Sequence, residues 1–151
     1  MRDAVGVESD PVTYDIEKGA IIRFAQAIGD DNAIFNREDD ARKTRYKGLV
    51  APPTFLRSVA HVETPEPKIK VSSPYPANVD GGSEWEYFEP VRLGDLITHF
   101  EKIIEVYKRN GRLGNMLFVI REGCYINQFK TLVVLERSTG IYYTPAEDDR
   151  P

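Results

Sequence analysis

The feature that most constrains the fold is a short apolar segment, residues 53–62, with prolines on both sides. Pro53 has a fixed φ and no N–H, and both properties suit the first turn of a helix. Four apolar side chains recur behind it at helical spacing: Phe55, Leu56, Val59 and Ala60. Pro65 and Pro67 end the segment soon afterwards. The pattern predicts a helix of about two to three turns that must be covered by the rest of the chain.

The chain after Pro67 has the alternating pattern of strands. The predicted strands are residues around Trp85–Tyr87, Leu96–Tyr107, Met116–Ile126 and Leu132–Tyr143. The alternation of the second strand slips at Ile103-Ile104, which predicts a bulge. Asn110-Gly111 is a strong signal for a hairpin turn between the second and third strands.

Helices are predicted in the first third of the chain. Residues 16–29 place their apolar side chains on one helical face, and Gly29 is suited to the C-cap. A polar turn is expected over residues 29–35. Asn36 is the expected N-cap of a second short helix with acidic residues in its first turn and basic residues in its last. Helices followed by a mostly antiparallel sheet predict an α+β fold.

Composition restricts the class of protein further. The 151 residues predict one domain, residues 1–151, with an ordered core at 11–144 and loose polar tails at 1–10 and 145–151. The net charge of −4 argues against a nucleic-acid partner. No apolar run approaches the roughly 18 residues of a membrane span, and the N-terminus lacks the apolar region of a signal peptide. With Cys124 as the only cysteine, we expect a cytoplasmic protein without a membrane partner.

Five motifs, in their order and spacing, resemble the MaoC-like hot-dog dehydratase family, specifically its N-terminal, non-catalytic type of domain. They are Phe24–Asn32, Tyr46–Phe55, Glu86–Asp95, Tyr125–Gln128 and Glu136–Ser138. The resemblance implies a hot-dog fold, in which an antiparallel sheet wraps around a central helix. It also implies the family's chemistry, the reversible hydration of trans-2-enoyl thioesters of coenzyme A or acyl carrier protein.

The first motif departs from the family's catalytic pattern. Active members carry a proton-transferring Asp and His in Gly-Asp-x-Asn-Pro-x-His. Gly29, Asp30 and Asn32 match this pattern, but Ala33 stands at the Pro position and Phe35 at the His position. Phenylalanine cannot move a proton. Asp30 and Asn32 remain the catalytic candidates, against the alternative that their side chains only hold a turn.

The second motif lacks the family's hydrogen-bond donor. Active members use a backbone N–H from Ala-His-Gly at the helix start to stabilise the thioester oxygen. Ala51 matches, but Pro52 and Pro53 replace His-Gly, and proline has no N–H. The resemblance still implies a substrate pocket at this helix start, with the candidate residues Phe35, Ala51, Pro53, Thr54 and Phe55.

The remaining candidates are histidines and basic residues. His61 and His99 are the only histidines. His99 is predicted at the solvent face or rim of its strand, while His61, two turns into the central helix, is either catalytic or structural. No resident cofactor is expected, because acyl-CoA or acyl carrier protein thioester is the substrate. The basic candidates for binding the phosphates of coenzyme A, against an ordinary solvated helix face, are Arg42, Lys43, Arg45 and Lys47.

Three functions remain open from the sequence. The favoured one is the acyl-thioester-binding, non-catalytic half of an (R)-specific enoyl-thioester hydratase or 3-hydroxyacyl-thioester dehydratase, paired with a catalytic hot-dog subunit. The second is a stand-alone homodimer that hydrates or hydrolyses an acyl thioester with Asp30 and His61. The third is an acyl-CoA-binding module without turnover. The residues do not distinguish acyl length, pathway or carrier.

Overall fold

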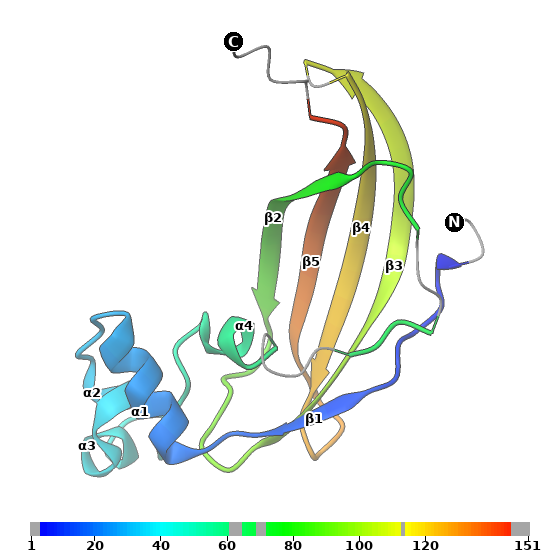
Figure 1. Cartoon of the computed structure of the whole chain (residues 1–151). Coiled ribbons are helices and arrows are strands. Elements are labelled where there is room, and N and C mark those ends of the chain that lie inside the picture. The colour runs from blue at the N-terminus through cyan, green and yellow to red at the C-terminus, as the bar shows by residue number, and fades with distance from the viewer. Residues whose placement is uncertain (1–3, 61–64, 69–71, 113, 146–151) are drawn as a thin grey trace.

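The computed structural model describes residues 4–60, 65–68, 72–112 and 114–145. Its elements are, in chain order, β1 (Val12–Asp15), α1 (Lys18–Ala27), α2 (Ala33–Asn36), α3 (Glu38–Arg42), α4 (Phe55–Ala60), β2 (Ala77–Tyr87), β3 (Leu96–Gly111), β4 (Gly114–Ile126) and β5 (Leu132–Tyr143). Short helices in the first half and long strands in the second confirm the predicted α+β class (Figure 1). Within the described ranges, no helix has the length and apolar character that a membrane span needs.

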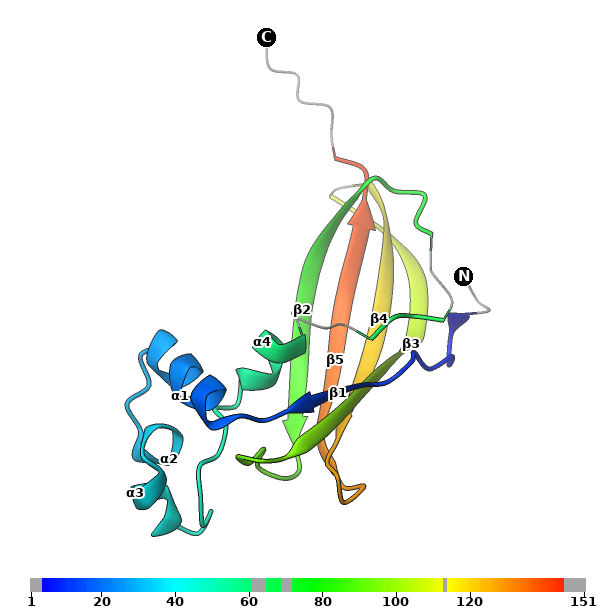
Figure 2. The ribbon, with the colours of Figure 1, turned by 60° about the horizontal axis from the view of Figure 1, so that its bottom comes forward.

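The strands form one antiparallel sheet in the order β1-β3-β4-β5-β2. The sheet is strongly bent, and α1, α2 and α3 gather on the side of its β2 edge (Figure 1). Figure 2 shows α4 between these helices and the sheet. Since β1 and β2 are the two edge strands, the 11-residue β2 presents the longer open edge.

The predicted central helix is α4, and the sheet covers it as expected. Phe55 and Leu56 are 2% and 1% exposed and pack in one core cluster with Tyr125. The helix begins at Phe55, where the N–H donates to the carbonyl of Pro52 (2.9 Å). This start lies after both prolines rather than at Pro53. The predicted continuation through residues 61–64 lies outside the described residues.

Most of the strand predictions are confirmed. The register of β3 against β4 shifts between Ile103 and Glu105, which is the predicted bulge. The chain reverses directly after Gly111, which pairs with Gly114. The bounds of β5 agree with the prediction. The short edge strand β1 was not predicted, because four residues carry too little periodicity to identify a strand.

The polar turn predicted at residues 29–35 contains a helix, which corrects the prediction there. Asn32 caps α2 by accepting a hydrogen bond from the N–H of Ile34 (3.2 Å). Asn36, expected to cap the next helix, ends α2, and Arg37 occupies the N-cap of α3. The Asn36 amide donates to the carbonyls of Asp30 (2.8 Å) and Asn32 (3.0 Å), which closes the loop on itself.

The loose tail predicted for residues 1–10 is wrong for residues 4–10. Ala4 and Ser9 are buried. The N–H of Gly6 donates to the carbonyl of Ile103, and the N–H of Ser9 donates to the carbonyl of Glu101, both at 2.8 Å. These residues follow the outer edge of β3 beyond β1, where the strand would otherwise leave its backbone groups without partners.

Candidate functional site

The loop after α1 holds the two residues of the catalytic motif that remain, Asp30 and Asn32. Gly29 ends the helix with φ +72°, a conformation that favours glycine. The N–H of Asp30 donates to the carbonyl of Ala25 (2.9 Å), and its carboxylate accepts the N–H of Asn32 (3.0 Å). These are the contacts of residues that hold a turn. The structure therefore gives both side chains local partners.

Phe35, at the family's histidine position, is part of an apolar cluster. Its side chain is 8% exposed and packs with Ala25 and Val50, with Ile34 and Tyr46 at the edge of the cluster. An aromatic ring here joins α2 to α1 and to the chain before α4. The position therefore contributes packing and an apolar wall rather than a proton acceptor.

At the donor position of the family, the segment before α4 carries prolines rather than a residue with an N–H. The N–H of Ala51 is bonded to the carbonyl of Val91 (2.8 Å). Pro52 and Pro53 have no N–H. The hydroxyl of Tyr87, at the end of β2, donates to the carbonyl of Pro53. The oxyanion-type donor of the family's active members is absent from this position.

A cavity of about 480 Å³, which we call the α4 pocket, lies at this helix start. Its apolar lining is Ile34, Phe35, Val50, Ala51, Pro52, Pro53, Leu56, Phe88, Pro90 and Val91, and its polar lining is Arg45, Tyr46, Tyr87, Glu89 and Arg92. The structure thus brings together Phe35, Ala51 and Pro53 of the predicted pocket. Two predicted members are corrected: Thr54 is turned to solvent, and Phe55 is buried in the core beneath the helix.

Only one of the four predicted basic residues lines the α4 pocket. Arg45 does so, with its guanidinium 4.9 Å from the centroid of the Tyr46 ring. Arg42 pairs with Glu38, and Lys43 pairs with Asp40, both within or next to α3. Lys47 is exposed in the turn before the pocket. Arg42 and Lys43 therefore fit the alternative interpretation, an ordinary solvated helix face.

Arg92 is a pocket residue that the sequence reasoning missed. Its guanidinium donates to the carbonyl of Tyr46, and its N–H donates to the carboxylate of Asp95 (2.8 Å). Its only sequence signal was its position inside the Glu86–Asp95 motif. Arg45 and Arg92 together give the α4 pocket two cations against one carboxylate, that of Glu89. The pocket is therefore suited to an apolar ligand that carries a negative group.

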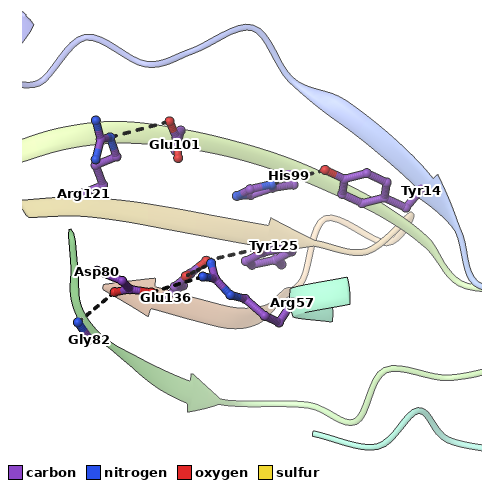
Figure 3. Close-up of polar contacts among 9 residues, drawn as sticks. All are labelled: Tyr14, Arg57, Asp80, Gly82, His99, Glu101, Arg121, Tyr125 and Glu136. Carbon is purple, nitrogen blue, oxygen red and sulfur yellow. Dashed lines mark hydrogen bonds and ion pairs between the residues drawn. The ribbon is translucent and has the colours of Figure 1, made fainter. Parts of the chain in front are cut away.

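A second set of polar side chains, the inner-face cluster, lies on the sheet face that meets α4 (Figure 3). Tyr14 and His99 share a hydrogen bond of 3.5 Å, and His99 stacks on Tyr125 with ring centroids 4.0 Å apart. The Tyr125 hydroxyl donates to Glu136 (3.1 Å), toward which Arg57 points from α4 (3.8 Å). The predicted rim position of His99 is wrong, because the side chain is 3% exposed.

Burial perturbs the ionisation of this inner-face cluster. It lowers the pKa of His99 to about 4, so the ring is neutral at neutral pH. It raises the pKa of Glu136, an effect that the Tyr125 hydrogen bond and the Arg57 charge oppose. The Nε2 atom of His99 has no hydrogen-bond partner among the described residues. His61, the other candidate, lies outside the described residues.

The side chains of the α4 pocket can be compared with the groups that dehydration of a thioester requires. Dehydration of a 3-hydroxyacyl thioester needs a base for the α-proton, an acid for the hydroxyl and a donor for the oxygen. Among the described residues, the lining of the α4 pocket has one carboxylate, Glu89, and neither a histidine nor a cysteine. In the described part of the chain, no three His, Cys, Asp or Glu side chains gather as a metal site. The described lining of the α4 pocket is therefore mainly apolar, with two guanidinium groups and one carboxylate as its charged groups.

Removing the carboxylate of Asp30 tests the turn-holding role. We expect Asp30→Ala to lower the free energy of unfolding by about 1 kcal/mol, because the N–H of Asn32 loses its acceptor. Asp30→Asn is the matched control, since it keeps an oxygen at the same position. Chemical denaturation gives both values. A stable Asp30→Asn variant whose complex with a catalytic subunit loses about a hundredfold in hydratase rate would instead identify Asp30 as a proton-transfer group.

Comparison with known proteins places these features in a family. Residues 3–136 match the family described as "FAS1-like, dehydratase domain region". A UPF0336 protein of Streptomyces avermitilis is 31% identical over 94 residues, which are 60% of this chain and 60% of that protein. The chain thus spans less than two thirds of that relative's length.

Solved structures with the same fold include two dehydratases. The HadBC (3R-hydroxyacyl-ACP dehydratase) complex of Mycobacterium tuberculosis has a TM-score of 0.75 and 23% identity, covering 92% of this chain and 97% of that one. A MaoC-like dehydratase from Rhodospirillum rubrum has a TM-score of 0.72 and 20% identity, covering 97% of both chains. These likenesses confirm the predicted hot-dog fold.

Proposed function

Because the chain belongs to the family of FAS1-like dehydratase domain regions, we propose that it is the non-catalytic, acyl-thioester-binding subunit of an (R)-specific enoyl-thioester hydratase or 3-hydroxyacyl-thioester dehydratase. The observation that carries this proposal is the α4 pocket. It lies at the family's site but has Phe35 in place of the base and Pro53 in place of the N–H donor. A pocket that has the family's position but lacks its catalytic groups can still bind an acyl thioester.

The lining of the α4 pocket supports an acyl thioester as the ligand. Its apolar walls, including Phe35, Val50 and Leu56, can cover an acyl chain or the pantetheine arm and exclude water. Arg45 and Arg92 offer guanidinium groups, which suit phosphate oxygens. In this account the chain holds and orients the thioester, while the partner removes the α-proton and protonates the departing hydroxyl.

The open edge of the sheet supports pairing with a second hot-dog chain. Strand β2 is an edge strand, and the aromatic residues at its end, Tyr87 and Phe88, are 41% and 48% exposed. An exposed strand edge of this length is a template for pairing with another chain. The HadBC complex provides the analogy of two different hot-dog chains in one dehydratase. We therefore propose a heterodimer with a catalytic subunit, and a homodimer when the chain is alone.

A variant that fills the α4 pocket tests the binding site. We expect Ala51→Phe to weaken binding of a medium-chain acyl-CoA by about tenfold or more, because the added ring occupies the space of the ligand. Isothermal titration calorimetry gives the dissociation constant. Ala27→Phe, on the exposed end of α1, is the matched control and should bind like the unmodified chain. A folded Ala51→Phe variant with unchanged affinity would place the acyl site elsewhere.

A further inference from the structure

Tyr87 holds a hydroxyl group at the point where the family's backbone donor is missing. It is the last residue of β2 and lines the α4 pocket. Its hydroxyl donates to the carbonyl of Pro53, so it lies against the start of α4. Its ring is oriented by stacking on Trp85, with ring centroids 6.4 Å apart and an interplanar angle of 19°. A rigid edge strand therefore presents this group to the helix start.

Other donors in the α4 pocket make hydrogen bonds to groups other than the Pro53 carbonyl, and the two guanidinium groups keep further N–H groups. Arg45 donates to the hydroxyl of Tyr46 (2.8 Å), and Arg92 donates to the carbonyl of Tyr46. The N–H of Ala51 is bonded to the carbonyl of Val91. Tyr87 is the lining side chain whose hydrogen bond goes to the helix start itself. Its present acceptor, Pro53, is an exposed residue, and a carbonyl there can exchange its donor for water.

We propose that the Tyr87 hydroxyl is the group that recognises the thioester carbonyl of a bound ligand in the α4 pocket, where the backbone N–H of the family is absent. This inference rests on the proposed function. The hydroxyl rotates from the Pro53 carbonyl to the carbonyl oxygen of the ligand and remains a donor throughout. Burial, and then the charge of Glu136, raise the pKa of Tyr87, which keeps the hydroxyl protonated at neutral pH. Tyr87 is thus a binding residue that selects ligands with a carbonyl at this point.

A pair of ligands that differ only at the carbonyl tests this role. The probes are a medium-chain acyl-CoA thioester and the matching alkyl-CoA thioether, in which CH₂ replaces C=O. We expect the unmodified chain to bind the thioester about fivefold to tenfold more tightly, because a neutral hydrogen bond contributes that much. Tyr87→Phe should lose this preference. Tyr107→Phe, which removes a hydroxyl on the exposed part of β3 outside the α4 pocket, should keep it.

Each outcome bears on a different claim. A Tyr87→Phe variant that keeps the thioester preference overturns the role of Tyr87 and leaves the proposed function standing. An unmodified chain that binds the thioester and the thioether equally would likewise overturn the role of Tyr87 and leave the proposed function standing. An unmodified chain that binds neither ligand overturns the proposed function and this inference with it. If Tyr87→Phe does not fold, the infrared carbonyl stretch of the bound thioester decides the question in the unmodified chain: a shift to lower frequency on binding is expected, and an unshifted band overturns the proposal.

Discussion

Phe35→His is expected to leave the isolated chain at the background rate of enoyl-thioester hydration. The imidazole would enter a site where the present side chain is 8% exposed and packed against Ala25 and Val50. The thioester oxygen would still lack a backbone donor, because Pro53 has no N–H. The Tyr87 hydroxyl, which also bonds the carbonyl of Pro53, is not a donor held in place for a developing oxyanion. One preorganised donor contributes on the order of a hundredfold to a thousandfold in rate, and general-base catalysis contributes a comparable factor. Because proton abstraction requires the developing oxyanion to be stabilised, neither group is effective alone.

Restoring both groups together is the control for this prediction. We expect the combination of Phe35→His, Ala33→Pro and Pro53→Gly to show weak but measurable turnover on crotonyl-CoA, followed by the absorbance of the conjugated enoyl thioester. Thermal unfolding of each variant must be recorded, since glycine at the start of α4 removes a proline that limits the unfolded state. A hundredfold gain from Phe35→His alone would contradict the account, because it would show that a donor able to stabilise the oxyanion is already in place.

The buried His99 is expected to make the folded state strongly sensitive to mild acid. Its pKa is about 4 in the folded chain and about 6.5 when unfolded. Between these values the unfolded chain binds the proton and the folded chain does not, so stability falls as the pH falls. The stabilisation is complete above pH 6.5 and is lost as the pH drops toward 4. The loss attributable to His99 is about 3 kcal/mol, measured by urea unfolding across this range.

Two carboxyl groups, the half-buried Glu101 and the buried Glu136, change the stability in the opposite direction as the pH falls, so a control variant is needed. Burial raises the pKa values of Glu101 and Glu136, so the folded chain holds their protons to higher pH than the unfolded chain does. Their protonation therefore favours the folded state as the pH falls. His99→Gln removes the histidine and leaves both carboxyl groups. Between pH 4 and pH 6.5, the free energy of unfolding should rise less steeply with pH in His99→Gln than in the unmodified chain. Equal slopes in the two chains would show that the pKa of His99 is the same in the folded and unfolded states.

Much of the fold could be predicted because the long elements carry strong periodicity. The alternation of β3 and its slip at Ile103 each have a local cause that the sequence displays. The hairpin was predicted from Asn110-Gly111, but these two residues end β3 and the chain reverses just after them. The short elements could not be predicted in the same way. Strand β1 and helix α2 have four residues each, and their formation depends on partners: β1 on pairing with β3, and α2 on the Asn32 cap and the Asn36 amide.

The candidate site was predicted in part. The resemblance to the family's motifs identified Phe35, Ala51 and Pro53 as pocket residues, and all three line the α4 pocket. Tyr87, the last residue of β2, and Arg92, in the segment between β2 and β3, come from a part of the chain far from α4 in sequence, and no local pattern indicates that approach. The burial of His99 follows from strand parity, since Ile97 on the same face is fully buried. A polar residue in an amphipathic strand is commonly assigned to the solvent face, and that assignment failed here.

The most direct test of the account is the rate of hydration of an enoyl thioester by the unmodified chain, measured with and without its catalytic partner. The complex should be purified from the native host and the chain then separated from it, so that both assays use the same preparation. The account predicts that the complex hydrates crotonyl-CoA or a longer enoyl thioester, and that the separated chain binds acyl-CoA but stays at the background rate. Robust hydration by the separated chain would contradict it, and the stand-alone alternative with Asp30 and His61 would then be the first to examine.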